Sequence, residues 1–261
     1  MKSSLFRKKL FWVLAILVLF VTVASVLLNS NLGIDDYETL PSIEEYTEIY
    51  SEVIERNRIM LENPIEYGDK FCSGYLSTTP DLDLHKSILN DLQILSDEIC
   101  KNAENDYEKV RAITYWVAEN IFYNHVAADS EVNADIISLE YVLKTKTATC
   151  AGYSNMFSAL CNMQGIYCVN LRGGTHDKML TAEYLMSVPV NHEWNAAMVD
   201  GEWIFVDTTW MSGNDYTENG YEQLDDLKEQ YFDISFEEMS FEHRIDIIDY
   251  RNFKMSIRAL E

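Results

Sequence analysis

The order of hydrophobic patterns along the chain predicts an α+β fold, with helices first and an antiparallel sheet later. Apolar residues recur at helical spacing in segments that precede residue 121. Alternating patterns and a strong hairpin signal, Asp200-Gly201, follow in the second half. About 230 residues lie beyond an N-terminal apolar run, which suits one α+β domain behind a helical extension.

Three helices are expected in the first half, over about residues 42–61, 84–101 and 107–120. The first opens with a capping box formed by Ser42 and Glu45. The third presents one apolar side, made of Val110, Ile113, Val117 and Ile121. These helices are expected to pack on the later sheet.

A further helix is expected to begin at Cys150 and to stop at Gly165, with Thr149 as its N-cap. Its apolar positions have helical spacing: Phe157, Leu160, Cys161 and Met163. A cysteine in a first turn meets the positive end of the helix dipole and unpaired backbone N–H groups, both of which favour thiolate over thiol. The pattern therefore predicts a partly activated nucleophile.

The Asp200-Gly201 turn sets the register of two strands around it. If Val199 faces Glu202, then His192 and Asp207 are diagonal neighbours on one face, with Cβ atoms about 7 Å apart. That face is otherwise apolar and is expected to be buried, so each polar group needs the other as a partner. The opposite face, which starts with Glu193, is expected to be covered by another strand. This pairing also places Asp207 on the second strand, opposite Trp194, and His192 opposite Thr209.

Three sequence blocks in this order resemble the transglutaminase-like superfamily of papain-type cysteine enzymes. The blocks are Lys146-Thr-Ala-Thr-Cys-Ala-Gly-Tyr-Ser-Asn-Met-Phe157, Asn191-His-Glu-Trp-Asn195 and Gly201-Glu-Trp-Ile-Phe-Val-Asp-Thr-Thr-Trp210. Weaker matches extend the resemblance over residues 106–243, where the stretch from Tyr231 to His243 is similar to the tail of bacterial members. The resemblance implies a papain-like fold of helices packed on an antiparallel sheet.

The same resemblance implies a catalytic triad in which Cys150 is the nucleophile, His192 the general base and acid, and Asp207 the orienting carboxylate. One position departs from the bacterial pattern, because Ala148 stands where those members usually have glycine two residues before the cysteine. No cofactor is implied. Any one of these three residues alone would more often be structural, so the prediction depends on their combination.

The remaining cysteines and histidines favour structural roles. Cys161 is expected to be a core thiol, and a disulfide with Cys168 is possible in an oxidising compartment but not required. Cys72 and Cys100 complete an odd count of five, which leaves one thiol free. Surface positions are expected for the other histidines, His85, His125, His176 and His243. No metal site is predicted, because C-x-x-C and H-E-x-x-H are absent and Asp81-Leu-Asp83 lacks the rest of a calcium loop.

Residues 10–28 form an uncharged apolar run of nineteen residues, about 28 Å long as a helix, which nearly matches the bilayer core. The preceding basic residues are Lys2, Arg7, Lys8 and Lys9. The positive-inside rule then predicts a single-pass anchor with the catalytic domain outside the cytoplasm. Cleavage of a signal peptide near Ser25, which would give a secreted protein, is the alternative.

The chain has a formal net charge of −23, and its first 30 residues hold four of the 20 basic groups and none of the 43 acidic groups. The part outside the membrane is therefore more acidic still. Such a surface repels nucleic acid and anionic lipid headgroups, so nucleic acid is excluded as a partner. The expected partners are a protein or peptide substrate, and the membrane through the N-terminal helix.

The sequence thus predicts a cytoplasmic basic segment (1–9), a transmembrane helix (10–28), a linker with a helical extension (29–83) and a transglutaminase-like domain (84–261). The expected activity is that of a membrane-anchored, extracytoplasmic cysteine enzyme acting on amide or peptide bonds, with hydrolysis favoured. Protein cross-linking, cleavage of glycan amides and a non-catalytic surface binding module are the alternatives.

Overall fold

The structure is a computed structural model that describes residues 42–62, 82–129, 134–176, 181–224 and 226–250, except for the side chains of 82–85, 134 and 135. The chain divides into two compact units, residues 1–45 and 46–261. The predicted transmembrane segment 10–28 lies outside the described residues. Within the described ranges, no helix is both long enough and apolar enough to cross a membrane.

The elements follow one another in the order expected of an α+β fold. The helices are α2 (Ile43–Ile49), α3 (Ser51–Glu62), α4 (Leu82–Cys100), α5 (Asp106–Asn120), α6 (His125–Ala128), α7 (Leu139–Thr145), α8 (Cys150–Met163), α9 (Ala182–Ser187), α10 (Thr208–Met211) and α11 (Phe236–Glu242), with 3-10 turns η2 (Ala134–Ile137) and η3 (Glu229–Tyr231). The strands are β1 (Phe122–Asn124), β2 (Thr147–Ala148), β3 (Cys168–Thr175), β4 (His192–Val199), β5 (Glu202–Val206), β6 (Asp215–Thr217), β7 (Gly220–Glu222), β8 (Phe232–Ile234) and β9 (His243–Tyr250).

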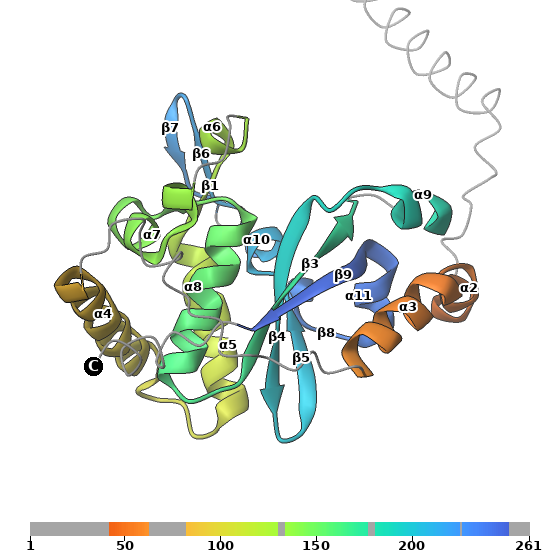
Figure 1. Ribbon diagram of the computed structural model, residues 1–261, viewed down its shortest axis with the longest axis horizontal. Coiled ribbons are helices and arrows are strands. Elements are labelled where there is room, and N and C mark those ends of the chain that lie inside the picture. The colour runs from red at the N-terminus through yellow and green to blue at the C-terminus, as the bar shows by residue number, and fades with distance from the viewer. Residues whose placement is uncertain (1–41, 63–81, 130–133, 177–180, 225, 251–261) are drawn as a thin grey trace, which may run out of the picture. The chain divides into compact units, whose positions relative to one another are not determined.

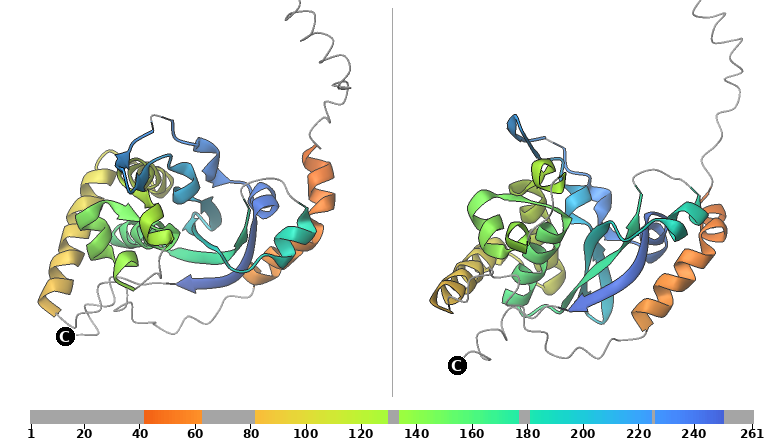
Figure 2. Two further views of the ribbon diagram at one scale, coloured as in Figure 1. Left: turned by 90° about the horizontal axis from the view of Figure 1, so that it is seen from above. Right: turned by 45° about the horizontal axis from the view of Figure 1, so that its top comes forward.

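A five-stranded sheet of order β8-β5-β4-β3-β9 forms the centre of the second unit, and all its pairs are antiparallel. The helices α4, α5 and α8 lie on one side of this sheet, and α3, α9 and α11 lie on the other (Figure 1). Figure 2 shows the same two helix groups in turned views. The predicted α+β class with helices packed on an antiparallel sheet is therefore confirmed.

Both faces of the β4–β5 hairpin are buried. The face that begins with His192 packs into a cluster with β3, α11 and β9, as its apolar pattern predicted. The opposite face was expected to meet another strand, and this is wrong, because α8 covers it. Polar groups explain the choice of a helix: the Asn195 side chain donates to the Ser154 carbonyl (3.2 Å) and to Ser158 Oγ (3.0 Å) of α8.

The predicted helices are present with small shifts at their ends. The capping box is confirmed, since the Ser42 and Glu45 side chains each accept the other's backbone N–H. The first predicted helix is divided at Tyr50 into α2 and α3. The apolar side of α5 is fully buried as predicted, with zero exposure at each of Val110, Ile113, Val117 and Ile121.

The hairpin turn adopts the predicted geometry, with φ of 53° at Asp200 and 90° at Gly201. The register is also confirmed, because Val199 faces Glu202 and the pairing continues to Asn195 and Val206. The strand ends there.

The placement of Asp207 on a strand and of Thr209 opposite His192 is wrong, because β5 gives way to the short helix α10. The physical reason is capping: the Asp207 side chain accepts the Trp210 backbone N–H at the start of this helix.

A second, small sheet of order β2-β1-β6-β7 was not predicted. It includes two parallel pairs, β1 with β2 and β1 with β6, which bring Tyr123 opposite both Ala148 and Asp215. The sheet thus connects the residues just before Cys150 with the chain that follows α10.

Candidate active site

Cys150 is the first residue of α8, as predicted, and it is half-buried. Thr149 occupies the N-cap position with an extended backbone, but its side chain makes no capping hydrogen bond. The cap side chain therefore accepts none of the first-turn N–H groups, although the Thr149 carbonyl accepts that of Gly152 at 2.9 Å, and the positive end of the helix lies beside the thiol.

Ala148, the departure from the bacterial pattern, is buried in β2 two residues before Cys150. Its methyl group is accommodated because residue 152 is glycine: a Cβ at Gly152 would lie 2.8 Å from that of Ala148. The substitution at this position is thus matched by the absence of a side chain on the facing turn of α8.

His192 begins β4 with a nearly buried side chain, 7% exposed, against the fully buried Asp207. Its Nε2 donates to Asp207 Oδ2 over 2.7 Å, which is the length of a charge-assisted hydrogen bond. The imidazole also stacks on two indoles, with ring centroids 6.0 Å from Trp194 and 5.3 Å from Trp210. The ring is therefore held in both position and tilt.

Asp207 accepts hydrogen bonds through both carboxylate oxygens although its side chain has no exposure to solvent. Oδ1 accepts the backbone N–H of Trp210 at 2.9 Å, and Oδ2 accepts from His192 and from His243, the latter at 3.1 Å. Its own backbone N–H donates to the carbonyl of Tyr231 over 2.9 Å. The carboxylate therefore has little freedom to rotate.

Burial and pairing shift the pKa values of His192 and Asp207 in opposite directions. Burial alone would lower the pKa of His192, but the charge and hydrogen bond of Asp207, with smaller interactions from Cys150, raise the pKa to about 10. Burial alone would raise the pKa of Asp207, yet His192 first and His243 next hold the pKa of that carboxyl well below its usual range. The arrangement favours an imidazolium paired with a carboxylate.

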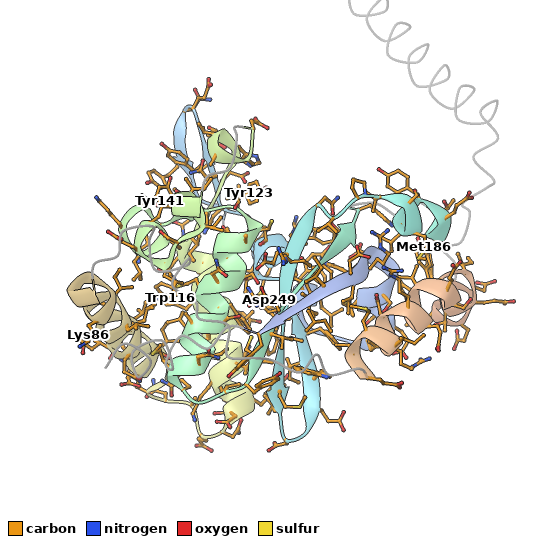
Figure 3. All side chains as sticks on the ribbon, in the orientation of Figure 1. Lys86, Trp116, Tyr123, Tyr141, Met186 and Asp249 are labelled. Atoms are coloured by element: carbon orange, nitrogen blue, oxygen red, sulfur yellow. The ribbon has the colours of Figure 1, made fainter. Side chains whose placement is uncertain are left out.

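Cys150 interacts with the imidazole of His192. A hydrogen bond and a charge interaction with Cys150 are among the causes that raise the pKa of His192. Tyr123 is the second neighbour of the thiol: burial, and next the charge of Cys150, raise the pKa of its phenol. Figure 3 shows Tyr123 near the N-terminal end of α8.

A pocket of about 310 Å³ opens beside the imidazole. It is lined by Tyr123, His125, His192, Thr209, Trp210, Ser212, Asp215, Lys228 and Tyr231. Aromatic rings form much of the wall, and an exposed pair, His125 with Asp215, lies at 2.9 Å on its rim. This pocket is the space in which a substrate could meet His192.

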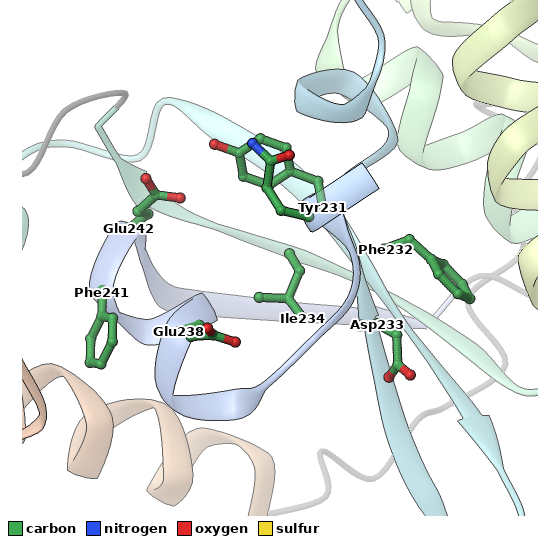
Figure 4. A pocket seen from close by; sticks show the side chains of 8 residues that line it. Tyr231, Phe232, Asp233, Ile234, Glu238, Phe241 and Glu242 are labelled. Atoms are coloured by element: carbon green, nitrogen blue, oxygen red, sulfur yellow. The ribbon is translucent and has the colours of Figure 1, made fainter. Parts of the chain in front are cut away.

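A second hollow, of about 400 Å³, shares Tyr231 with the pocket beside His192, and Figure 4 shows the residues that line this hollow. Its floor includes Ile234 and Phe241, and three carboxylates line it: Asp233, Glu238 and Glu242. Asp233 accepts a hydrogen bond from the Tyr107 hydroxyl, and Glu238 accepts one from the Ser235 hydroxyl.

The described cysteines are all free thiols. Cys161 has no exposure, which confirms the predicted core thiol, and Cys168 and Cys100 are also buried. The disulfide between Cys161 and Cys168, which the sequence left open, is not formed. Cys72 lies outside the described residues.

The surface positions expected for the remaining histidines are only partly correct. His125 is exposed, but His176 and His243 are buried, so the expectation is wrong for both. The side chain of His85 lies outside the described residues. His243 is the functional candidate that sequence reasoning missed, since it stands 36 residues after its partner Asp207 and no local pattern connects the two.

The ligand atoms of His192, Asp207 and His243 lie within 4.8 Å of one another, a grouping that also suits a metal ion. A search for metal-binding motifs in the sequence cannot find such a set, because its three residues come together only in the folded chain. A metal would need the lone pair of each Nε2, whereas N–O distances of 2.7 and 3.1 Å require a proton on each. The three residues fit a hydrogen-bonded group better than a metal site.

The family model described as the transglutaminase-like superfamily matches residues 93–208, a segment that includes Cys150, His192 and Asp207. The chain therefore contains a transglutaminase-like domain. This bears out the resemblance of the three sequence blocks at the level of the superfamily.

Curated relatives are similar to about half of the chain. The mouse kyphoscoliosis peptidase is 34% identical over 128 residues, which cover 49% of this chain and 19% of that protein. The LIM and transglutaminase domain protein ltd-1 of Caenorhabditis elegans is 26% identical over 142 residues, which cover 53% of this chain and 19% of that protein. The chain thus spans about a fifth of the length of these relatives.

Solved structures of similar proteins include a TGase, with 19% identity, a TM-score of 0.38 and coverage of 73% of this chain and 44% of that chain. Another is the periplasmic domain of TgpA from Pseudomonas aeruginosa, with 16% identity, a TM-score of 0.37 and coverage of 53% of each chain.

Proposed function

We propose that the transglutaminase-like domain is a cysteine enzyme that hydrolyses amide or peptide bonds through Cys150, His192 and Asp207. The observation that carries the proposal is the 2.7 Å hydrogen bond that fixes His192 on the buried Asp207, together with the interaction of the same imidazole with Cys150 at the start of α8. A nucleophile, a base and an orienting carboxylate are the three groups that a catalytic triad uses for covalent acyl transfer.

The proposed reaction uses these three residues in turn. The Cys150 thiolate attacks the substrate carbonyl, and backbone N–H groups of the first turn of α8 stabilise the resulting oxyanion. The His192 imidazolium gives its proton to the departing amine, which leaves a thioester on Cys150. The neutral imidazole then takes a proton from water, whose oxygen attacks the thioester and releases the acid. Asp207 keeps the ring oriented and balances its charge throughout.

Location and substrate belong to the same proposal. The apolar run at residues 10–28, preceded by basic residues, supports a single-pass anchor with the domain outside the cytoplasm. A protein or peptide substrate is supported by the pocket beside His192, because the solvent-exposed His125 is among the residues that line this pocket. The peptidase name of one relative supports hydrolysis over cross-linking.

The proposal is tested by labelling the full chain, purified in detergent, with a peptide-based acylating probe for cysteine and mapping the modified residue by mass spectrometry. Labelling at Cys150 but not at the buried Cys161 is expected. No labelling of Cys150 in folded protein would instead favour a non-catalytic binding module. Incubation of peptides with a primary amine separates the reactions, because hydrolysis yields a free acid and cross-linking incorporates the amine.

A further inference from the structure

Two histidines share one oxygen of the orienting carboxylate. The Nε2 atoms of His192 and His243 lie 2.7 and 3.1 Å from Oδ2 of Asp207. An ionised carboxylate only accepts hydrogen bonds, so both nitrogens must carry a proton. Asp207 therefore has one donor besides its catalytic partner on the same oxygen.

The backbone of His243 is fixed from three elements. At the end of α11, its N–H donates to the Met239 carbonyl. Its carbonyl accepts from the Asn57 side chain of α3 at 2.8 Å, and Asn57 also accepts the N–H of Ile245 at 2.6 Å. In the sheet, His243 pairs with Thr175 of β3. The backbone that carries the ring is thus held by contacts that do not involve Asp207.

The ring itself lies in an apolar cage. His243 has no exposure, and its centroid lies 4.8 Å from that of Trp194 and 4.7 Å from that of Trp210. Within the described residues, its Nδ1 has no hydrogen-bond partner, and the bond to Asp207 is the polar contact of the ring. Burying an imidazole among indoles is costly unless its polar atoms are used, and the one that is used reaches the orienting carboxylate.

We propose that His243 is a positioning residue, which donates its Nε2–H to Asp207 and thereby keeps that carboxylate ionised and aimed at His192. The proposal rests on the proposed function, because it assigns His243 to the same site. His243 does not touch the reacting atoms. It acts through Asp207, and the groups that lie against its ring are Asp207, His192 and the two indoles.

The consequence of losing this donor follows from the balance of charge. A buried carboxylate with fewer donors is protonated more easily, and the His243 hydrogen bond is one of the interactions that hold the pKa of Asp207 low. A protonated Asp207 cannot balance the His192 imidazolium, which in turn can no longer support the Cys150 thiolate. The reactive form of the site should then be lost at a higher pH than in the unmodified protein.

The test measures the rate at which iodoacetamide alkylates Cys150 in the full chain, from about pH 4 to about pH 10, with the site mapped by mass spectrometry. In His243→Phe, which keeps a ring but no donor, the acid limb of the profile is expected to move up by about one pH unit. In His243→Gln, the amide nitrogen can reach the place of Nε2. The acid limb should therefore return most of the way to its position in the unsubstituted protein. Ser240→Ala, which removes a buried hydrogen bond of α11 with Asn57, should lower Tm without moving the profile.

An unmoved acid limb in folded His243→Phe, or identical profiles for the Phe and Gln variants, would overturn the proposal and leave His243 a packing residue. If His243→Phe does not fold, the ¹⁵N spectrum of histidine-labelled, unsubstituted protein decides: His243 must be protonated at Nε2, and a ring protonated only at Nδ1 overturns the proposal. Failure of the proposed function is distinct, because Cys150 would then show no enhanced alkylation even with His243 in place.

Discussion

Two histidine–aspartate pairs contribute to one pocket, and the largest difference between them is burial. His192 and Asp207 are 2.7 Å apart with side chains 7% and 0% exposed, whereas His125 and Asp215 are 2.9 Å apart with side chains 48% and 41% exposed. Their hydrogen-bond lengths are almost the same. Distance alone would therefore not distinguish the pair that we assign to catalysis from its neighbour on the rim.

The difference lies in what surrounds each pair. Water screens the exposed pair, and such surface pairs are typically worth about 0–1 kcal/mol. The buried pair is enclosed by two indoles, and Asp207 accepts from three donors. Burial would lower the pKa of His192, but the charge and the hydrogen bond of Asp207 outweigh it and raise the pKa to about 10. A buried carboxylate can fix the orientation and the charge of its histidine partner. His192 has such a partner in Asp207, whereas the partner of His125 is exposed to solvent.

The largest expected effect concerns the thiol that His192 serves. Cys150→Ala should abolish acyl transfer while the fold persists, because a small residue at a helix start removes little packing. Activity would be measured as cleavage of a peptide amide once a substrate is found, or as reaction with the acylating probe before that. Residual turnover above about one per cent would contradict the assignment, since loss of a triad member typically costs several powers of ten.

The matched control is Cys161→Ala, which removes a fully buried thiol from the same helix. It should keep the activity and lower Tm, because it leaves a small cavity in the core. If Cys161→Ala loses activity and Cys150→Ala does not, the two cysteines have been assigned the wrong way round.

The second prediction sets the two pairs against each other. Asp207→Asn should slow alkylation of Cys150 near neutral pH by about 10²- to 10⁴-fold, because the imidazolium loses its carboxylate and the thiolate loses its imidazolium. The profile should require a higher pH to reach the same rate. Asp215→Asn should change the rate by no more than a few-fold, since its pair is exposed.

Equal effects from Asp207→Asn and Asp215→Asn would show that burial does not separate the two pairs. A large effect from Asp215→Asn alone would move the site toward His125.

The free energy of unfolding should also differ between the buried and the exposed pair, with a smaller effect than on the alkylation rate. The pKa of His192 is raised in the folded state, so its contribution is fully present below the usual value of about 6.5 and is lost as pH rises toward about 10. The pKa of Asp207 is lowered, so its contribution is present above its usual value of about 3.8 and is lost as pH falls below it. The stability gained from the pair should therefore be greatest between about pH 4 and 6.5.

The measurement is the free energy of unfolding of the unsubstituted protein minus that of Asp207→Asn, followed across pH. The difference should reach about 3–5 kcal/mol inside that window and should shrink toward about pH 10. For Asp215→Asn it should stay within about 1 kcal/mol. A difference for Asp207→Asn that does not vary with pH would mean that the carboxylate contributes through shape and not through charge.

The sequence predicts those parts of the site that depend on short-range signals. The N-cap position and the glycine stop of the helix that starts at Cys150 are only sixteen positions apart in the sequence. The Asp200-Gly201 turn determines the register of the strands beside it. Local chemistry was therefore enough to bring His192 near Asp207, although the two are 15 residues apart.

Other features depend on signals that are too short or too distant. The strands of the small sheet have only two or three residues, which is too few for an alternating pattern to emerge. Asp207 leaves the strand to cap α10, which the polar Thr208 after it could have indicated. His243 reaches Asp207 only because β9 pairs with β3, a contact that no local pattern predicts.

The smallest predicted effect separates the turn of the hairpin from its catalytic end. Asp200 has a positive φ of 53°, which asparagine tolerates and alanine does not, so Asp200→Ala should cost about 1–2 kcal/mol and Asp200→Asn almost nothing. Neither change should move the pH profile of Cys150 alkylation, because this third aspartate has no histidine partner in the described structure and lies at the far end of the strands from Asp207. Urea unfolding and alkylation of the same preparations would measure both. If Asp200→Ala shifts the profile as far as Asp207→Asn does, then the turn and not the buried carboxylate holds His192. The burial of Asp207 would then not explain why His192 differs from His125.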